Sequence, residues 1–205
     1  MIGADRTLFF GGSFNPVHNA HLACARAAAL AAGFGQVMLV PAYQPNLKDR
    51  TYDLAAAEHR LAMLERAAEA APDETVRFAV DPIELSRPGP SYTIDTAEAL
   101  HRRGLSMPIN WLIGADQVLH LHRWHRFADL LKHVRFWVMH RPGYEIDWDA
   151  VHPDARALRE REVEVPQMDV SATDIRARVR AGQPIDHFVS ANVREYILAH
   201  RLYIP

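Results

Sequence analysis

The sequence predicts an α/β protein, a Rossmann-like doubly wound parallel sheet with a helical C-terminal portion. Short apolar runs of strand length alternate with amphipathic segments of helix length along most of the chain. The runs are apolar at consecutive positions rather than at every second one, which is typical of parallel strands covered on both faces. Because crossovers between parallel strands are right-handed, such a series winds its helices over both faces of one sheet.

The N-terminal elements are marked by the signals at their ends. Residues 7–10 form the first expected strand, which Gly11 and Gly12 end. A helix is expected from an N-cap at Asn19 to about residue 32, and Gly33 suits its C-terminal stop. Asp53 is the expected N-cap of the next helix. The apolar positions that keep a helical period after Asp53 are Leu54, Ala57, Leu61, Leu64 and Ala68.

The remaining elements alternate in the same way. A helix is expected from Thr93 to Arg103, ended near Gly104, and a shorter one over residues 127–131. Two further helices are expected near the end of the chain, at residues 174–181 and 191–199. The other expected strands are residues 37–40, 76–80, 109–113, 135–139 and 163–165.

Composition excludes several classes of protein. Of the 205 residues, 49% are hydrophobic and 23% are charged, which is the balance of an ordinary globular protein rather than a disordered or fibrous one. A net charge of −2 gives no basic excess, so neither a nucleic-acid partner nor a membrane surface is expected. No linker-like or repeated segment divides the chain, and we expect one domain over residues 1–205.

The cysteine content and the N-terminus indicate a reducing, cytoplasmic location. Cys24 is the one cysteine, so no intrachain disulfide can form, and its alanine-rich surroundings indicate a buried thiol rather than a nucleophile. The N-terminus shows no basic region followed by an apolar core and a cleavage site. The oligomeric state is left open, with a homo-oligomer as one alternative.

Four polar or glycine-rich segments follow the expected strands. Ligands of doubly wound sheets bind outside the carboxyl ends of the strands, where the strand order reverses. We therefore expect these segments to meet at one site. They are Gly11–His21, Pro41–Lys48, Gly114–Trp124 and Arg141–Gly143.

The first of these segments has the properties of an anion-binding turn. Gly11 and Gly12 allow the backbone to approach a bulky anion, and the helix behind them offers free N–H groups. His18 and His21 are three residues apart, so both lie near one face of the first helical turn and can donate to phosphate oxygens. The spacing is neither that of a dinucleotide-binding turn nor that of a phosphate loop with a lysine. Two incidental histidines or a metal-binding pair remain alternatives.

A second phosphate-binding segment is expected near the end of the chain. Ser171 and Thr173 precede an amphipathic helix, and Thr173 is its expected N-cap. Arg176 lies in the first turn, where its guanidinium can face whatever the N-terminus of the helix holds. A plain capped helix with a solvated arginine is the alternative from the residues alone.

These two segments resemble the signatures of the nucleotidylyltransferase superfamily. Residues 11–21 are similar to its G-G-[ST]-F-[DN]-P-x-H-x-G-H motif, with Ala20 in place of the usual glycine. Residues 170–176 are similar to its [IV]-S-[ST]-T-x-[IL]-R motif, with Ala172 in place of a serine or threonine. The resemblance implies a Rossmann-like nucleotidyl transfer enzyme.

Other segments resemble the bacterial nicotinate mononucleotide adenylyltransferases in particular. Residues 90–96, P-S-Y-T-I-D-T, are similar to their acceptor-ring segment, and Gly114-Ala115-Asp116 with Leu121 and Trp124 is similar to their G-[AS]-D…L…W stretch. Residues 58–64 and 196–203 are also similar to segments of this family, so the resemblance covers roughly residues 8–203. One departure is Leu47, where the family has a histidine after two prolines.

The resemblance implies transfer of the adenylyl group of ATP to nicotinate mononucleotide, with Mg²⁺ delivered by ATP and no metal ion held by the protein itself. The implied catalytic residues are His18, His21, Lys48 and Arg176. The implied ATP contacts are Gly11, Gly12, Ser13, Phe14, His21, Gly114, Asp116, Arg141, Ser171, Thr173 and Arg176. The implied acceptor contacts are Asn15, Lys48, Tyr92, Thr93 and Trp124.

Several alternatives stay open beside this interpretation. Leu47 leaves room for nicotinamide mononucleotide or another phosphate-bearing acceptor, and a non-catalytic nucleotide sensor could share the fold. A zinc site at His120, His122 and His125 is a weaker alternative, because no cysteine accompanies these histidines.

Overall fold

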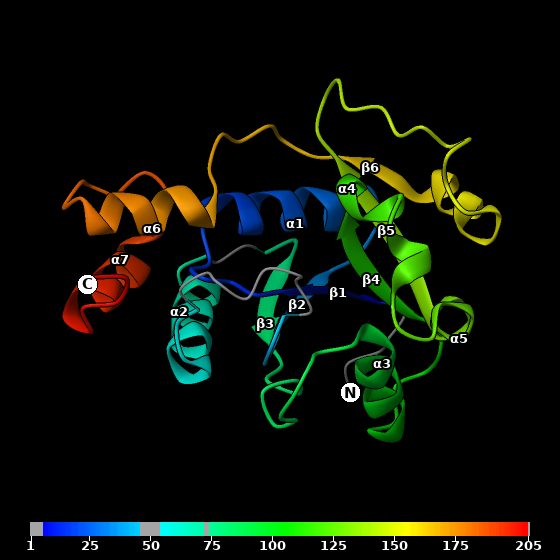
Figure 1. The fold of residues 1–205 in the computed structure, drawn as a ribbon, viewed down its shortest axis with the longest axis horizontal. Coiled ribbons are helices and arrows are strands. Elements are labelled where there is room, and N and C mark those ends of the chain that lie inside the picture. Colours follow the sequence, from blue (N-terminus) through cyan, green and yellow to red (C-terminus); the bar gives the residue numbers. More distant parts are fainter. Residues whose placement is uncertain (1–5, 46–53, 72–73, 205) are drawn as a thin grey trace.

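The computed structural model describes residues 6–45, 54–71 and 74–204. In these residues, six parallel strands form one sheet in the order β3-β2-β1-β4-β5-β6 (Figure 1). The strand order reverses between the neighbours β1 and β4, which is the arrangement of a doubly wound sheet. The predicted fold class is therefore confirmed. The strands are β1 (Thr7–Gly12), β2 (Gln36–Pro41), β3 (Arg77–Val80), β4 (Ile109–Gly114), β5 (Val134–His140) and β6 (Glu162–Glu164).

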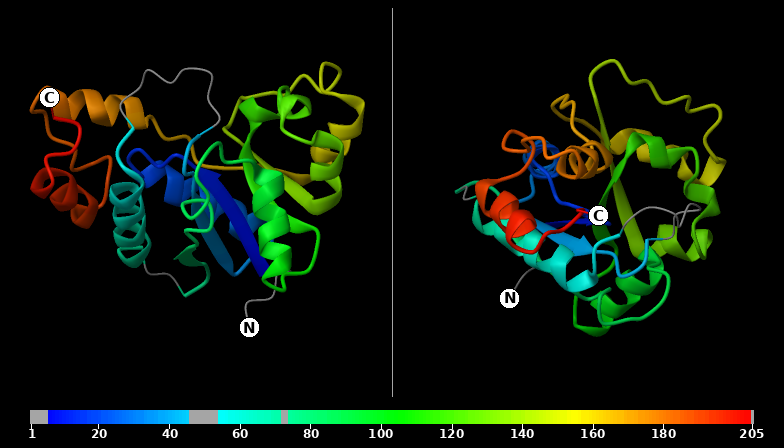
Figure 2. Two further views of the ribbon diagram at one scale, coloured as in Figure 1. Left: turned by 60° about the horizontal axis from the view of Figure 1, so that its bottom comes forward. Right: turned by 60° about the vertical axis from the view of Figure 1, so that its left-hand side comes forward.

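Helices cover both faces of the sheet (Figures 1 and 2). One core cluster joins Leu8 and Phe10 of β1 to the helices α1, α2, α6 and α7, and the other joins Phe9 of the same strand to α3, α4 and α5. Consecutive residues of β1 are thus buried on opposite faces, as its continuous apolar run predicts. The α-helices are α1 (Asn19–Ala31), α2 (Ala57–Glu69), α3 (Thr93–Arg102), α4 (Ala115–Val118), α5 (Phe127–His133), α6 (Ala172–Arg180) and α7 (Ala191–Ala199).

Helix α1 tests the residues that the sequence predicts at its two ends. Gly33 has φ +78°, and the amide groups of Gly33 and Phe34 donate to the carbonyls of Leu30 and Ala29. This is the hydrogen-bond pattern of a Schellman stop, so the predicted C-terminal signal is confirmed. The predicted N-cap was wrong by one residue, because His18 takes the cap position and Asn19 is the first helical residue.

Two other predicted caps were also wrong. Helix α2 begins at Ala57 with Ala56 as its N-cap, whereas Asp53 lies outside the described residues and too early in the chain. Helix α6 begins at Ala172, and its N-cap is Ser171 rather than Thr173, because the Ser171 Oγ accepts from the Asp174 amide at 3.1 Å. Serine and threonine both suit a cap, so composition alone does not choose between them.

Two short 3-10 helices follow α4 and β5, η2 (Leu121–Arg123) and η3 (Pro153–Arg161), and neither was predicted. His125 lies beyond η2, so it shares no helix with His122. The C-terminal helices α6 and α7 lie beside α1 and α2 in both views of Figure 2. None of the helices in the described part of the chain is both long and apolar enough to cross a bilayer.

Candidate active site

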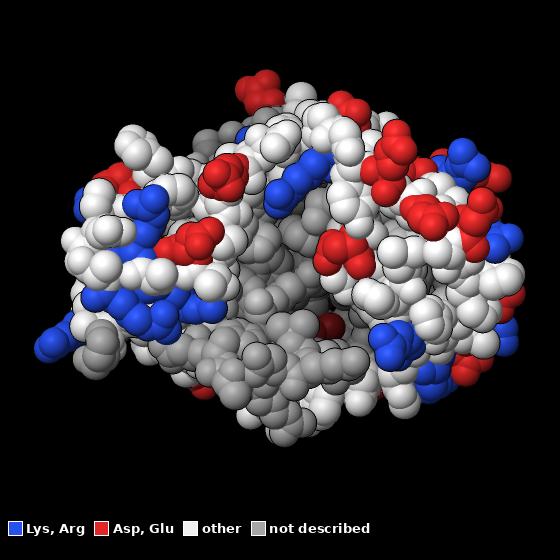
Figure 3. Space-filling model, turned by 45° about the horizontal axis from the view of Figure 1, so that its top comes forward, with Lys and Arg blue, Asp and Glu red and all other residues white. Residues whose placement is uncertain are grey.

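A cleft of about 1300 Å³ opens at the carboxyl ends of β1 and β4. The sheet reverses its strand order at this point, and ligands of doubly wound sheets bind there. The space-filling view shows the molecule hollowed at its centre, with basic and acidic side chains both present around the opening (Figure 3). The predicted site residues that line the cleft are Gly11, Gly12, Ser13, His18, His21, Tyr92, Thr93, Gly114, Asp116, Trp124, Arg141 and Ser171.

The glycine turn, residues 11–18, joins β1 to α1. It is shaped by the aromatic side chains packed against it. A Cβ atom at Gly11 would lie 2.5 Å from Cζ2 of Trp111, and one at Gly12 would lie 3.2 Å from Cζ of Phe14. Phe14 has φ +46° and is buried, with its ring edge-on to the ring of His21 at 5.1 Å. Phe14 therefore supports His21 from below instead of lining the cleft. Any side chain at Gly11 would have to displace the indole.

His18 and His21 stand together at the start of α1. Their rings stack with centroids 3.6 Å apart, and the His18 backbone N–H donates to Nδ1 of His21 at 3.2 Å. An accepting Nδ1 carries no proton, so in the neutral ring of His21 the proton is on Nε2. The predicted placement of both histidines on one face of the first turn is confirmed.

Both histidines are neutral at pH 7. Burial, with a smaller contribution from the charge of Arg141, lowers the pKa of His18 to about 4. Burial, with a smaller contribution from His18, lowers the pKa of His21 well below its usual value. Nδ1 of His18 is buried and has no hydrogen-bond partner among the described residues. A polar ring atom buried at the cleft without a partner is a candidate for hydrogen bonding to a ligand.

Asn15 and Arg176 lie beneath the cleft rather than in its lining. The Asn15 Oδ1 accepts from the Ala55 amide at 3.1 Å and from the Tyr203 hydroxyl at 2.9 Å. The Arg176 Nη1 donates to the Asn15 carbonyl at 2.8 Å, and its Nη2 donates to the Thr173 hydroxyl at 3.4 Å. These contacts tie the glycine turn to α6 and to the end of the chain. The phosphate-binding role of Arg176 stays a prediction.

The other end of the cleft carries the aromatic residues predicted for the acceptor. Tyr92 is the N-cap residue of α3 and its ring lies 4.4 Å from that of His125, tilted by 31°. Trp124 is partly exposed and packs edge-on against Phe136, with centroids 6.0 Å apart. Thr93 is the first residue of α3, where backbone N–H groups favour an anion. The cleft thus offers aromatic faces beside a helix N-terminus.

The remaining predicted site residues differ in their exposure and in their position relative to the cleft. Asp116 is exposed in the first turn of α4, and a Cβ at Gly114 would overlap its carboxylate. Arg141 is exposed beside the cleft, just after β5. Thr173 is exposed and does not line the cleft. Lys48, together with Leu47, lies outside the described residues.

Arg60 of α2 is a buried residue whose role the sequence did not reveal. It is 1% exposed, and its Nη1 donates to the carbonyls of Ser13 at 2.9 Å and Ala42 at 2.6 Å. Its Nη2 donates to the carbonyl of Tyr43 at 3.0 Å. Arg60 therefore joins the glycine turn to the segment after β2. A signal was present, since Arg60 falls on the buried stripe of α2 with Met63, Leu64 and Ala67.

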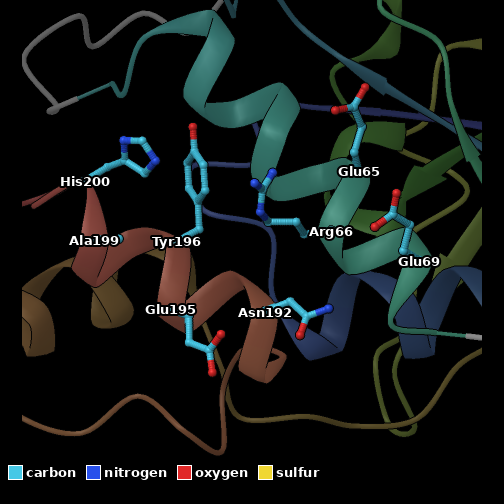
Figure 4. Close-up of a pocket in the computed structure, with 8 residues that line it drawn as sticks. All are labelled: Glu65, Arg66, Glu69, Asn192, Glu195, Tyr196, Ala199 and His200. Atoms are coloured by element: carbon cyan, nitrogen blue, oxygen red, sulfur yellow. The ribbon is translucent and has the colours of Figure 1, made fainter.

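A smaller hollow of about 550 Å³ lies between α2 and α7 (Figure 4). Tyr196 lies at its centre, with the Arg66 guanidinium 4.4 Å from its ring and the His200 ring 4.1 Å from it. None of the predicted site residues lines this hollow. Within the described residues, no group of three or more His, Cys, Asp or Glu side chains is arranged to hold a metal ion. The large cleft is therefore the candidate active site.

Comparisons with known proteins agree with the family resemblance that the sequence motifs indicate. Residues 9–178 match the family model described as cytidylyltransferase-like. A protein of Herpetosiphon aurantiacus named "Probable nicotinate-nucleotide adenylyltransferase" is 39% identical over 98% of this chain and 99% of its own length. A protein of Bacillus pumilus with the same name is 38% identical over 95% and 96%.

One solved structure illustrates the similarity of fold. The Plasmodium falciparum nicotinic acid mononucleotide adenylyltransferase, complexed with NaAD, superposes with a TM-score of 0.69. The superposition covers 96% of each chain at 15% sequence identity. At that identity the similarity concerns the fold alone.

Proposed function

The chain belongs to the cytidylyltransferase-like family and, within it, to the nicotinate-nucleotide adenylyltransferases, and from this we propose how its cleft performs the reaction. The enzyme transfers the adenylyl group of ATP to nicotinate mononucleotide, which yields nicotinate adenine dinucleotide and pyrophosphate for NAD biosynthesis. The acceptor phosphate attacks the α-phosphorus in line, and the bond to the pyrophosphate breaks. A phosphate monoester is largely dianionic at pH 7, so the attack needs no general base.

The stacked histidines carry this proposal most directly. Their neutral rings present hydrogen-bond donors to phosphate oxygens at the positive end of α1. Because the rings are held by stacking and by the His18 backbone N–H, they need little reorganisation during the transfer. Catalysis here consists of positioning and of stabilising charge on the phosphates. We propose His18 and His21 as catalytic residues that donate hydrogen bonds, with Lys48 as a cation toward the phosphates.

Mg²⁺ is proposed to arrive with ATP, where it neutralises phosphate charge. The donor set of the cleft fits a shared ion rather than a resident one. Asp116 is an exposed carboxylate in α4, just after β4, and would lie beside the phosphates that carry the ion. Chelation of Mg²⁺ should therefore abolish turnover without changing the thermal stability of the protein alone.

The proposal is tested with a panel of acceptors. Nicotinate mononucleotide, nicotinamide mononucleotide and no acceptor are each incubated with ATP and Mg²⁺, and both pyrophosphate and dinucleotide are measured. We expect the acid to give the highest kcat/KM, because the N-terminus of α3 favours its negative charge. Absence of dinucleotide with every acceptor would favour the non-catalytic sensor. His21→Ala should lower kcat by on the order of 100-fold.

The amide acceptor remains a second candidate because of Leu47. The family has a histidine there, and leucine lacks its polar ring, so a hydrogen bond of the family to its substrate could be lost. The panel is therefore repeated with Leu47→His. Equal or better use of the amide by the wild-type enzyme, reversed by this substitution, would make Leu47 the determinant of a changed specificity.

Arg176 has two proposed roles that kinetics can separate. If it binds the pyrophosphate side of ATP, Arg176→Lys raises the KM for ATP alone. If its contact with the Asn15 carbonyl matters more, the same substitution lowers thermal stability and raises both KM values.

The domain organisation, partners and location of the protein complete the proposal. We propose one domain over residues 1–205, small-molecule substrates alone, no nucleic-acid or membrane partner, and a cytoplasmic location where ATP is available. A homo-oligomer is compatible with each of these.

A further inference from the structure

We propose that Glu84 is a positioning residue, which holds the segment Ser91–Thr93 in the arrangement that receives the acceptor. The inference rests on the proposed function, because that function assigns Tyr92 and Thr93 to the acceptor. Glu84 lines the cleft, yet only 4% of its surface is exposed to solvent. A carboxylate buried to this extent needs hydrogen-bond donors around it.

A hydroxyl group of α3 supplies one such donor. The Thr96 Oγ1 donates to Oε1 of Glu84 at 2.6 Å, and the Ser91 hydroxyl lies close enough to lower the pKa of this carboxyl group. Thr96 is fully buried and accepts from Nη2 of Arg87 at 2.6 Å. Burial raises the pKa of Glu84, while the two hydroxyls and the charge of Arg87 act in the opposite direction. The carboxyl group of Glu84 thus belongs to a network that joins Arg87, Thr96 and the carbonyl of Tyr92.

This network reaches a second wall of the cleft through Ser91. The Ser91 Oγ accepts from the Tyr43 amide at 3.0 Å, and the Ser91 amide donates to the Gln44 carbonyl at 3.0 Å. The segment before α3 is therefore fastened to the segment after β2. Both segments line the cleft, at Ser91, Tyr92 and Thr93 on one side and at Ala42 and Pro45 on the other.

The donors around Glu84 set the direction of its hydrogen bonds. Its Oε1 accepts from the Thr96 hydroxyl, and the Ser91 oxygen accepts from the Tyr43 amide, so the Ser91 proton is available to the nearby carboxyl group. Without Glu84, the hydroxyl of Ser91 is free to turn and the order of the segment declines. The consequence falls on the acceptor end of the cleft, because the glycine turn and its histidines are held by other contacts.

Steady-state kinetics on four variants tests the inference. Glu84→Ala removes the acceptor of the Thr96 hydroxyl and the carboxyl group beside Ser91, and it should raise the KM for nicotinate mononucleotide by at least about tenfold. Glu84→Gln keeps one carbonyl oxygen and should recover part of that loss, while Ser91→Ala should reproduce the defect. The KM for ATP should stay within about twofold of the wild-type value in all three. Ser86→Ala is the matched control, because its hydroxyl donates to the Ile83 carbonyl on the same loop.

The possible outcomes are distinct. Equal increases of both KM values, or unchanged acceptor KM in Glu84→Ala and Ser91→Ala, would overturn the inference. If Glu84→Ala does not fold, Ser91→Ala alone decides the matter. A wild-type enzyme that forms no dinucleotide would refute the proposed function itself. Dinucleotide formation by the wild-type enzyme is therefore measured before any variant is compared.

Discussion

Protonation of His18 should make the stability of this protein depend on pH in a defined window. The pKa of His18 is about 4 in the folded protein and 6.5 as its ordinary value. At pH values between 4 and 6.5, His18 is therefore mostly protonated in the unfolded chain and mostly neutral in the folded protein. Stability is fully present above about pH 6.5 and is lost as the pH falls toward 4. At pH 5 the loss attributable to His18 is about 2 kcal/mol.

The perturbation that tests this is His18→Gln, which keeps a polar side chain but cannot titrate. Urea denaturation of both proteins at pH 7.5 and pH 5.0 gives the free energy of unfolding at each pH. The wild-type protein should lose about 2 kcal/mol more than the variant, or about 1 M in its urea midpoint. Apart from His21, whose pKa depends in part on His18, the other titrating groups are common to both proteins and cancel in this difference. Replacing the exposed His122 by Gln serves as the control and should keep the wild-type dependence. Identical pH dependence in His18→Gln and wild type would refute the argument.

Three further predictions concern packing, capping and ligand binding. Gly11→Ala places a Cβ 2.5 Å from Trp111 and should lower the free energy of unfolding by about 1–3 kcal/mol, measured by urea denaturation; an unchanged midpoint would show that the indole moves freely. Ser171→Ala removes the N-cap of α6 and should cost about 1 kcal/mol in the same assay, whereas Thr173→Ala should cost less; the reverse order would restore Thr173 as the cap. Trp124→Ala should weaken binding of nicotinate mononucleotide by about tenfold to a hundredfold in calorimetric titration and leave ATP binding unchanged. A loss of ATP affinity would move Trp124 to the other substrate.

The fold was predictable in part because several elements end at glycine, whose backbone is the least restricted. Gly11 and Gly12 end β1, Gly33 follows α1 and Gly114 ends β4, each beside the element that the sequence predicted. The caps were less predictable. Ser171 and Thr173 have the same hydrogen-bonding chemistry, and the choice depends on the direction in which the chain enters α6.

The lining of the candidate site was predictable to a large extent, but its supports were not. Segments that follow neighbouring parallel strands meet at one edge, so the cleft could be inferred from Gly11–His21 and Gly114–Trp124. Arg60 and Glu84 are charged residues, and a charged residue in a sequence is expected to be exposed. Their burial depends on carbonyls and hydroxyls that distant segments supply. No local pattern contains those partners.

Asn15 shows why the two signature segments act as one unit. It belongs to the glycine turn, yet its side chain binds the hydroxyl of Tyr203 and its carbonyl binds Arg176. These partners are 188 and 161 residues away in the sequence. Because the backbone carbonyl and the side-chain oxygen of one buried residue are both used, a shift of α6 must move the turn that carries His18 and His21. The C-terminal helices therefore support the turn that we propose to bind phosphate, although most of their residues do not line the cleft.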